Sequence, residues 1–129
     1  MSYRLDHLVL TVQDVERTCL FYQQNLNIPT VTFGTNRKAL QLGAQKINLH
    51  PATQPLRPHA QHPLPGSADI CLITDTPIPI LIARLHTKGV MILEGPVQRT
   101  GAQGPLLSIY IRDPDGNLIE LANECSSRE

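Results

Sequence analysis

The sequence predicts an α+β fold of two βαβββ modules, whose curved mixed sheets surround a shared cleft. Two observations support this prediction. The first half of the chain reads as one strand, one helix and three strands, and the second half repeats that order. Between the halves, residues 51–66 contain five prolines, which favours an extended connection, here called the strap. We therefore expect one domain, with module one at about residues 4–50, the strap at 51–66 and module two at about 67–123.

In the first module, residues alternate between two faces along Leu5–Val12, which is typical of a half-buried strand. Asp14 is then placed to cap a helix that runs to about Asn25. Three short strands are expected after it, at Thr30–Phe33, Arg37–Leu42 and Gln45–His50.

The second module begins with a strand over Ala68–Thr74. A helix is expected over Pro77–Lys88, because proline is tolerated in a first turn and Gly89 is favoured just after a helix. The last three strands are expected at Met91–Val97, Leu107–Arg112 and Leu118–Ala122. The final two are joined by Asp113-Pro114-Asp115-Gly116, a sequence typical of a tight turn.

Composition argues against several classes of function. The 129 residues carry a formal net charge of zero and no run of lysine or arginine, so neither nucleic acid nor a membrane surface is expected as a partner. No apolar stretch approaches the roughly 20 residues that span a bilayer. The N-terminus lacks the apolar segment of a signal peptide, so we expect a cytoplasmic protein.

The three cysteines, Cys19, Cys71 and Cys125, are far apart in the sequence. They form no Cys-x-x-Cys pair, so neither a zinc ribbon nor a disulfide framework is indicated. Cys71 lies in an apolar run and is expected in the core.

Polar residues of metal-binding type interrupt apolar strands at corresponding places in the two modules. His7 and Asp69 lie on the first strands of their modules, whereas Asn48, His50 and Glu120 lie on the last strands. If these strands line one cleft, the repeat brings the five side chains together. A His/Asp/Glu set suits a divalent ion such as Mn, Fe, Ni, Co or Zn. An incomplete protein shell would leave coordination positions for water or substrate.

These residues also have explanations that need no metal. Asp69 could cap the turn before it, and Glu120 could pair with Arg112 or Lys46. A lone strand histidine such as His7 is more often half-exposed or hydrogen-bonded than a ligand.

Three further candidates can also be explained without a role in binding or catalysis. His50 could simply end its strand before Pro51. Tyr110 could be a packing residue rather than a substrate contact. Arg99 could be a solvated loop arginine, although an anion contact is also open to it.

The sequence resembles the vicinal oxygen chelate superfamily, which includes glyoxalase I, bleomycin-resistance proteins and extradiol dioxygenases. The resemblance rests on Leu-Asp-His-Leu-Val-Leu-Thr-Val at residues 5–12, on Phe21-Tyr22, and on Tyr-Ile-Arg-Asp-Pro-Asp-Gly-Asn-Leu-Ile-Glu at 110–120. Within the superfamily, residues 36–40, 45–50, 65–71 and 94–102 are similar to the glyoxalase domain-containing protein 5 group, also labelled virulence proteins in bacteria.

This resemblance implies two βαβββ modules that form a cleft with a divalent metal, and a homodimer. By position, His7 matches the first-strand histidine ligand and Glu120 the last-strand glutamate ligand. Asp69 stands where the superfamily usually has a second histidine, which disfavours a His/His/Glu dioxygenase iron site. Asn48 stands where glyoxalase I has a fourth, glutamate ligand, which disfavours glyoxalase I activity as such.

We therefore predict a divalent-metal-dependent enzyme of the glyoxalase/dioxygenase family, acting on a small substrate with vicinal oxygens. His7, Asp69 and Glu120 would hold Zn, Ni, Mn, Fe or Co. Glu120 and His50 are the expected catalytic groups. The residues expected to bind substrate are Asn48, Arg99 and Tyr110.

The alternative is a metal-free small-molecule binding protein of the bleomycin-resistance type. Such a cleft is often aromatic, and this chain has two Phe, three Tyr and no Trp, which mildly favours the enzyme. A third possibility is an interaction protein that uses the strap.

Overall fold

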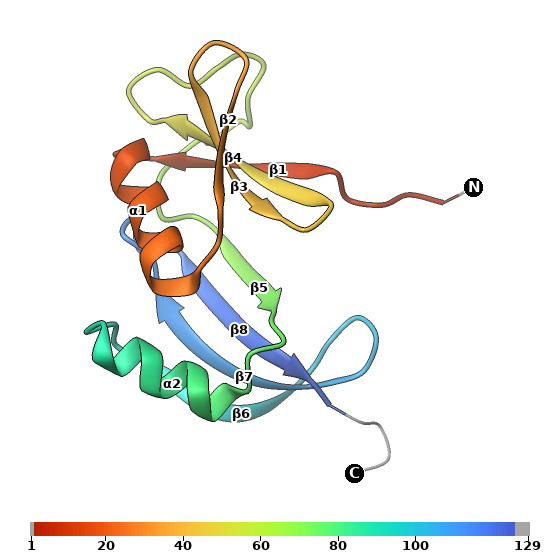
Figure 1. Ribbon diagram of the computed structural model, residues 1–129. Helices are drawn as coiled ribbons and strands as arrows, with labels where there is room; N and C mark the ends of the chain where they lie inside the picture. The colour runs from red at the N-terminus through yellow and green to blue at the C-terminus, as the bar shows by residue number, and fades with distance from the viewer. Residues whose placement is uncertain (1, 126–129) are drawn as a thin grey trace. The chain divides into compact units, whose positions relative to one another are not determined.

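The computed structural model describes residues 2–125 and contains two four-stranded sheets, each accompanied by one α-helix (Figure 1). The chain divides into two compact units. Unit one comprises residues 2–68 and 114–116, and unit two comprises residues 69–113 and 117–125. Each unit has the predicted order of one strand, one helix and three strands, so the α+β prediction is confirmed.

The elements of unit one are β1 (His7–Val12), α1 (Val15–Leu26), β2 (Thr30–Phe33), β3 (Arg37–Leu42) and β4 (Gln45–Pro51). Its sheet has the order β1-β4-β3-β2, with β1 and β4 parallel and the other pairs antiparallel. A parallel pair needs a long crossover, and here the crossover contains α1, β2 and β3.

Helix α1 begins and ends as its sequence predicts. The Asp14 carboxylate accepts a hydrogen bond from the backbone N–H of Arg17 at 3.1 Å, which satisfies one of the free donors of the first turn. Asn27 follows the helix with a φ of 55°, in the left-handed region that asparagine tolerates better than most residues. Cys19 and Tyr22 are buried on the face that α1 turns inward.

The elements of unit two are β5 (Asp69–Ile73), α2 (Ile78–Thr87), β6 (Glu94–Thr100), β7 (Pro105–Arg112) and β8 (Leu118–Glu124). Its sheet repeats the topology of unit one, in the order β5-β8-β7-β6 with β5 and β8 parallel (Figure 1). Four side chains of β7 and β8, Ile109, Ile111, Ile119 and Leu121, are buried and form much of this unit's core.

The start of α2 is held by a residue from another element. Pro77 precedes the helix and provides no side-chain cap. Instead, the Asn123 side-chain oxygen accepts the backbone N–H of Ile78 at 2.8 Å. Its amide nitrogen donates to the backbone carbonyls of Thr74 and Thr76 at 2.9 and 2.8 Å. Asn123 on β8 therefore orders both the connection after β5 and the first turn of α2.

The strand predicted over Met91–Val97 is displaced. Residues 91–93 lie outside any strand, and β6 runs from Glu94 to Thr100. The pairing of β6 with β7 also shifts register between Glu94 and Val97. Gly95 and Pro96 lie at that shift, and proline cannot donate a ladder hydrogen bond.

The β7–β8 hairpin closes as predicted. Gly116 has a φ of 89°, which only glycine adopts without strain. The Asp113 carboxylate is buried and accepts from Asn117 twice, from the backbone N–H at 3.0 Å and from the side-chain amide at 2.8 Å. In residues 2–125, neither helix is long and apolar enough to cross a membrane.

Candidate functional site

The predicted histidine ligand, His7, is exposed at the start of β1 in unit one. Its Nδ1 lies 2.8 Å from Oδ2 of the neighbouring Asp6. The hydrogen bond to His7 lowers the pKa of the Asp6 carboxyl, so this side chain is charged at neutral pH. The contact orients the imidazole and leaves Nε2 as the nitrogen through which His7 could bind a metal.

Two other candidates of unit one, Asn48 and His50, are buried on β4, with 5% and 6% of their surfaces exposed. The register of the parallel pair places Asn48 beside Val9 and His50 beside Thr11. Because residues two apart share a face of a strand, His7 and Val9 of β1 lie on the same face as Asn48 and His50. Unit one therefore brings together three of the predicted site residues.

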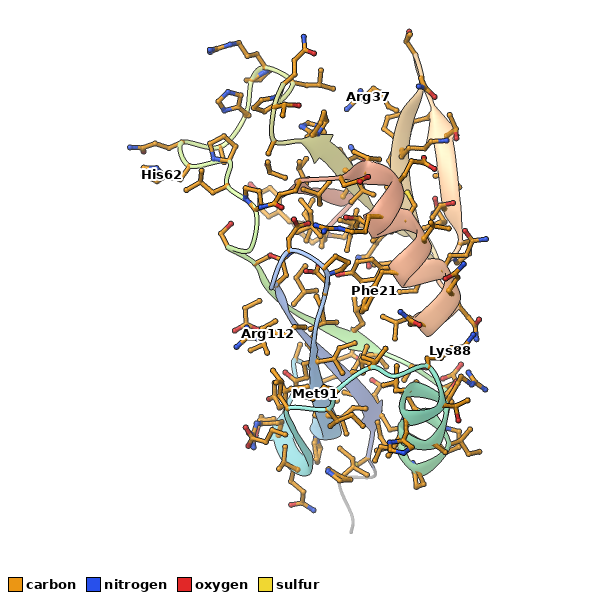
Figure 2. All side chains as sticks on the ribbon, turned by 90° about the vertical axis from the view of Figure 1, so that its left-hand side faces the viewer. Phe21, Arg37, His62, Lys88, Met91 and Arg112 are labelled. Carbon is orange, nitrogen blue, oxygen red and sulfur yellow. The ribbon has the colours of Figure 1, made fainter. Side chains whose placement is uncertain are left out.

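These three residues line a pocket of about 400 Å³ within unit one. The pocket is completed by Val9 and Arg37 from the sheet and by Leu56, Arg57 and Pro58 from the strap. The strap therefore contributes directly to the wall of this pocket. His62, further along the strap, is exposed and projects outward (Figure 2).

Arg37 of β3, labelled in Figure 2, contacts two side chains of unit one. Its guanidinium lies 4.7 Å from the centre of the Phe33 ring, a cation–π contact. Its Nη2 also lies 3.4 Å from Nε2 of His50. Burial, with the positive charge of Arg37 and a smaller contribution from His59, lowers the pKa of His50. His50 is therefore neutral at pH 7.

In unit two, the candidates Asp69 and Glu120 share one face of the sheet. Asp69 and Cys71 are two residues apart on β5, and the register places Cys71 directly beside Glu120 on β8. The same row continues across β7 with Tyr110, which pairs with Glu120, and across β6 with Glu94, which pairs with Tyr110.

The expectation that Cys71 is a core residue is wrong, because Cys71 is exposed on this face. The strand alternates, and the core takes the other face of β5. Partial burial of the thiol, together with the charge of Glu120 and the hydrogen bond to its carboxylate, raises the pKa of Cys71 to about 11. A thiol with this pKa is protonated at pH 7 and is a poor nucleophile.

Arg99 and Tyr110, the other predicted substrate contacts, bind each other. Arg99 Nε donates to the Tyr110 hydroxyl at 2.8 Å, and Nη2 lies 3.1 Å from the Glu94 carboxylate. Arg99 is part of β6, so the interpretation of Arg99 as a loop arginine is wrong. Its contacts fix the orientation of the Tyr110 hydroxyl on the face that carries Glu120.

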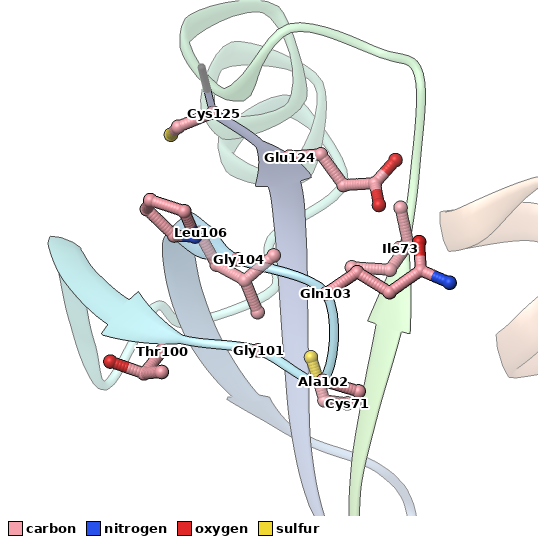
Figure 3. Close-up of a pocket in the computed structure, with 11 residues that line it drawn as sticks. Cys71, Ile73, Thr100, Gly101, Ala102, Gln103, Gly104, Leu106, Glu124 and Cys125 are labelled. Atoms are coloured by element: carbon pink, nitrogen blue, oxygen red, sulfur yellow. The ribbon is translucent and has the colours of Figure 1, made fainter. Parts of the chain in front are cut away.

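A second pocket, of about 520 Å³, lies within unit two. Figure 3 shows the residues that line it, with Cys71 and Cys125 at opposite ends of the labelled group. None of the residues predicted to bind metal or substrate lines this pocket. It adjoins the predicted site through Cys71, which lines the pocket and pairs with Glu120.

The predicted metal ligands are divided between the units, with His7 in unit one and Asp69 and Glu120 in unit two. Within residues 2–125, no three His, Cys, Asp or Glu side chains form a group arranged to hold a metal ion. The donor types nevertheless suit a divalent ion, since imidazole and carboxylate are common ligands of Zn, Mn and Fe. The three-residue ligand set remains a prediction.

Sequence reasoning missed Asp6, Arg37 and Arg57 as neighbours of the site. Asp6 could have been noted, because a carboxylate next to a candidate ligand histidine is a usual orienting partner. Arg37 and Arg57 had no local signal. Arg37 reaches His50 only through the pairing of β3 with β4, and Arg57 reaches the pocket through the path of the strap.

The order of one strand, one helix and three strands occurs in both units, and one family model matches residues of both. Residues 4–121 match the model of the Glyoxalase/Bleomycin resistance protein/Dioxygenase superfamily, and the chain belongs to this family.

Two relatives share half or more of their aligned residues with this chain. The chain is 56% identical over 119 residues to Virulence protein STM3117 of Salmonella typhimurium, which covers 92% of this chain and 83% of the relative. It is 50% identical over 119 residues to Glyoxalase domain-containing protein RDO1 of Mycosarcoma maydis, which covers 92% of this chain and 67% of that protein. The crystal structure of the Salmonella protein superposes with a TM-score of 0.94, covering 97% of this chain and 99% of that one.

Proposed function

We propose that the protein is a divalent-metal-dependent enzyme of the glyoxalase/dioxygenase type that acts on a small substrate with vicinal oxygens. Its metal ligands are His7, Asp69 and Glu120. A Zn, Ni, Mn, Fe or Co ion bound by these residues would polarise the substrate oxygens and stabilise negative charge on them.

The observation that carries the proposal is the contact between His7 and Asp6. Metal-binding histidines usually donate their second ring N–H to a carboxylate or carbonyl, which fixes the ring and strengthens the ligand nitrogen. His7 has such a partner at 2.8 Å, and its imidazole is exposed rather than packed in the core. A strand histidine that only formed hydrogen bonds with its surroundings would not need this orientation of the ring.

The face shared by Asp69 and Glu120 supports the same proposal. Asp69 lies two residues along β5 from Cys71, which pairs with Glu120 on the adjacent strand, so a cation bound on this face would be near both carboxylates. The Cys71 thiol that contacts Glu120 is neutral and a weak donor, so it offers little compensation for the charge.

The remaining residues have roles that follow from their environments. His50 is neutral and its Nε2 faces Arg37, so it can orient the substrate by donating a hydrogen bond from Nδ1. Glu120 would help to hold the metal, and its carboxylate is the candidate general base. Arg99 orients the Tyr110 hydroxyl toward the substrate, and the Asn48 amide supplies a further polar contact.

Metal analysis of the purified protein tests the proposal. We expect one equivalent of a divalent metal in the wild type and in His62→Ala, which alters an exposed strap histidine. His7→Ala and Glu120→Gln should each lose most of the metal while keeping a wild-type circular dichroism spectrum. The proposal fails if the wild type binds no stoichiometric metal after reconstitution, or if both variants retain it.

A homodimer is also part of the proposal. Size-exclusion chromatography with light scattering should then give twice the chain mass of 14.3 kDa. The chain mass itself, at micromolar concentration, would contradict this part.

The second candidate function is metal-free binding of a small molecule. The pocket of unit two favours it, because a volume of about 520 Å³ falls in the usual range for small-molecule sites and contains none of the proposed ligands. Thermal shifts across a metabolite panel, with and without chelator, separate the two functions. A ligand-induced shift that chelator leaves unchanged would favour the binding protein.

A further inference from the structure

We propose that the pocket lined by His7, Asn48 and His50 binds the oxyanion, carboxylate or phosphate, of a small molecule through Arg37, His50 and Arg57. The inference deepens the proposed function by naming a chemical class of substrate. It rests on that function only in assigning the bound anion to the substrate, since the pocket itself needs no metal.

The first argument is that polar atoms around this pocket are buried without partners. In the described part of the chain, Nδ1 of His50, Nε of Arg37 and Oδ1 of Asn48 have neither solvent contact nor a hydrogen bond. All three residues line the pocket. Buried polar groups in folded proteins almost always have partners, so these atoms indicate a missing ligand. Such a ligand must offer acceptors to the two nitrogens and a donor to the Asn48 oxygen.

The protonation of His50 shows that its unsatisfied atom is a donor. A guanidinium can only donate hydrogen bonds, so Nε2 of His50 must accept from Arg37 Nη2 at 3.4 Å. The imidazole is neutral and therefore carries its single proton on Nδ1. His50 Nδ1–H and Arg37 Nε–H are then two buried donors, and both call for an acceptor.

The charge of the lining favours a negatively charged acceptor. Arg37 and Arg57 both line the pocket, and the lining contains no Asp or Glu. Among residues 2–125, neither arginine forms an ion pair with a carboxylate. Arginine binds carboxylate and phosphate oxygens with paired N–H groups, so these side chains suit either anion.

The rest of the pocket restricts the size and character of the ligand. The volume of about 400 Å³ admits a small organic molecule. Val9, Leu56 and Pro58 form apolar walls on the sheet and strap sides. A short organic acid or phosphate ester, with a small apolar body, fits this combination.

Calorimetric titration of the chelator-treated protein tests the inference directly. Isobutyrate and inorganic phosphate are the two anionic probes, and isobutyramide is the neutral match of the first. We expect at least one anion to bind and the amide to show no measurable binding. The stronger of the two anions identifies the group as carboxylate or phosphate.

Variants locate the site. Arg37→Gln and Arg57→Gln should each weaken anion binding at least tenfold. Arg84→Gln, on the exposed surface of α2 in unit two, should leave it unchanged. Arg57 is exposed on the strap, so its substitution tests the pocket even if Arg37→Gln does not fold.

Two results would overturn the inference: equal binding of amide and acid, or undiminished binding by Arg57→Gln. Because the protein is free of metal in this assay, these failures are distinct from failure of the metal proposal. A protein that binds anions here but holds no metal would overturn only the proposed function.

Discussion

Replacing Glu120 by Gln should make Cys71 more reactive, because the carboxylate opposes formation of a thiolate beside it. Raising the pKa of Cys71 from its ordinary value of 9.0 to about 11 makes the thiolate about 100-fold scarcer at pH 8. Burial is the largest cause of this shift, and Glu120 contributes through its charge and its hydrogen bond. Glu120→Gln removes the charge but not the burial of the thiol. The variant should therefore recover part of the 100-fold loss of thiolate.

We expect Glu120→Gln to speed the alkylation of Cys71 by roughly three- to tenfold at pH 8, since the thiolate is the reacting species. The assay is iodoacetamide labelling of the chelator-treated protein between pH 7 and 10.5, followed by peptide mass spectrometry. Removing metal is necessary because a cation at Glu120 would offset the charge that acts on Cys71. Cys125 in the same protein is the internal reference. Glu124→Gln is the matched control, because Glu124 lies on the same strand but contributes nothing to the pKa of Cys71.

The sign of the effect is what makes this prediction decisive. A lower pKa gives more thiolate at a fixed pH. The variant must therefore react faster, and the midpoint of its rate–pH profile must shift to lower pH. A wild-type profile with its midpoint near 9, or equal rates for wild type and Glu120→Gln, would refute the proposed contact between Glu120 and Cys71.

Three further predictions concern stability. Asn123→Ala loses three hydrogen bonds at and before the start of α2, so it should lower the free energy of unfolding, measured in urea, by roughly 2–4 kcal/mol. The control Glu124→Ala should change this free energy little. A loss below about 1 kcal/mol in Asn123→Ala would contradict the role of Asn123. The pKa of His50 is lowered, so the neutral form stabilises the fold above pH 6.5 and stability should fall as the pH drops below that value. His50→Gln should flatten the pH dependence of urea unfolding between pH 7 and 5, and an unchanged slope would count against it. Arg99→Gln should change stability by less than about 1 kcal/mol, because its ion pair with Glu94 is solvent-exposed, and a larger loss in the same assay would mean that the pair is structural.

Local sequence signals were sufficient for most elements of the fold. The bounds of β2 and β3 match the prediction at both ends, because turn residues at Gly34 and Gly43 limit these strands. Helix α1 begins after Asp14 because the cap is a contact within one turn. β6 was placed wrongly because its limits depend on pairing with β7 and on the register shift at Gly95 and Pro96.

Candidate residues in the functional site were predicted from residue type and position in the repeat. These signals named His7, Asn48 and His50 in unit one, and the structure places all three at one pocket. They also named Glu120 and Tyr110 in unit two, which pair directly across β8 and β7.

The sequence by itself determined the repeated order of elements, the faces of the strands and the turns that join them. These depend on period-two alternation and on the conformations that glycine, proline and asparagine allow, which act over a few residues. Only the tertiary structure decided that Glu120 meets Cys71 and that Arg37 meets His50. Those contacts depend on the register between strands far apart in the chain, which is set by packing of the whole sheet rather than by any local pattern.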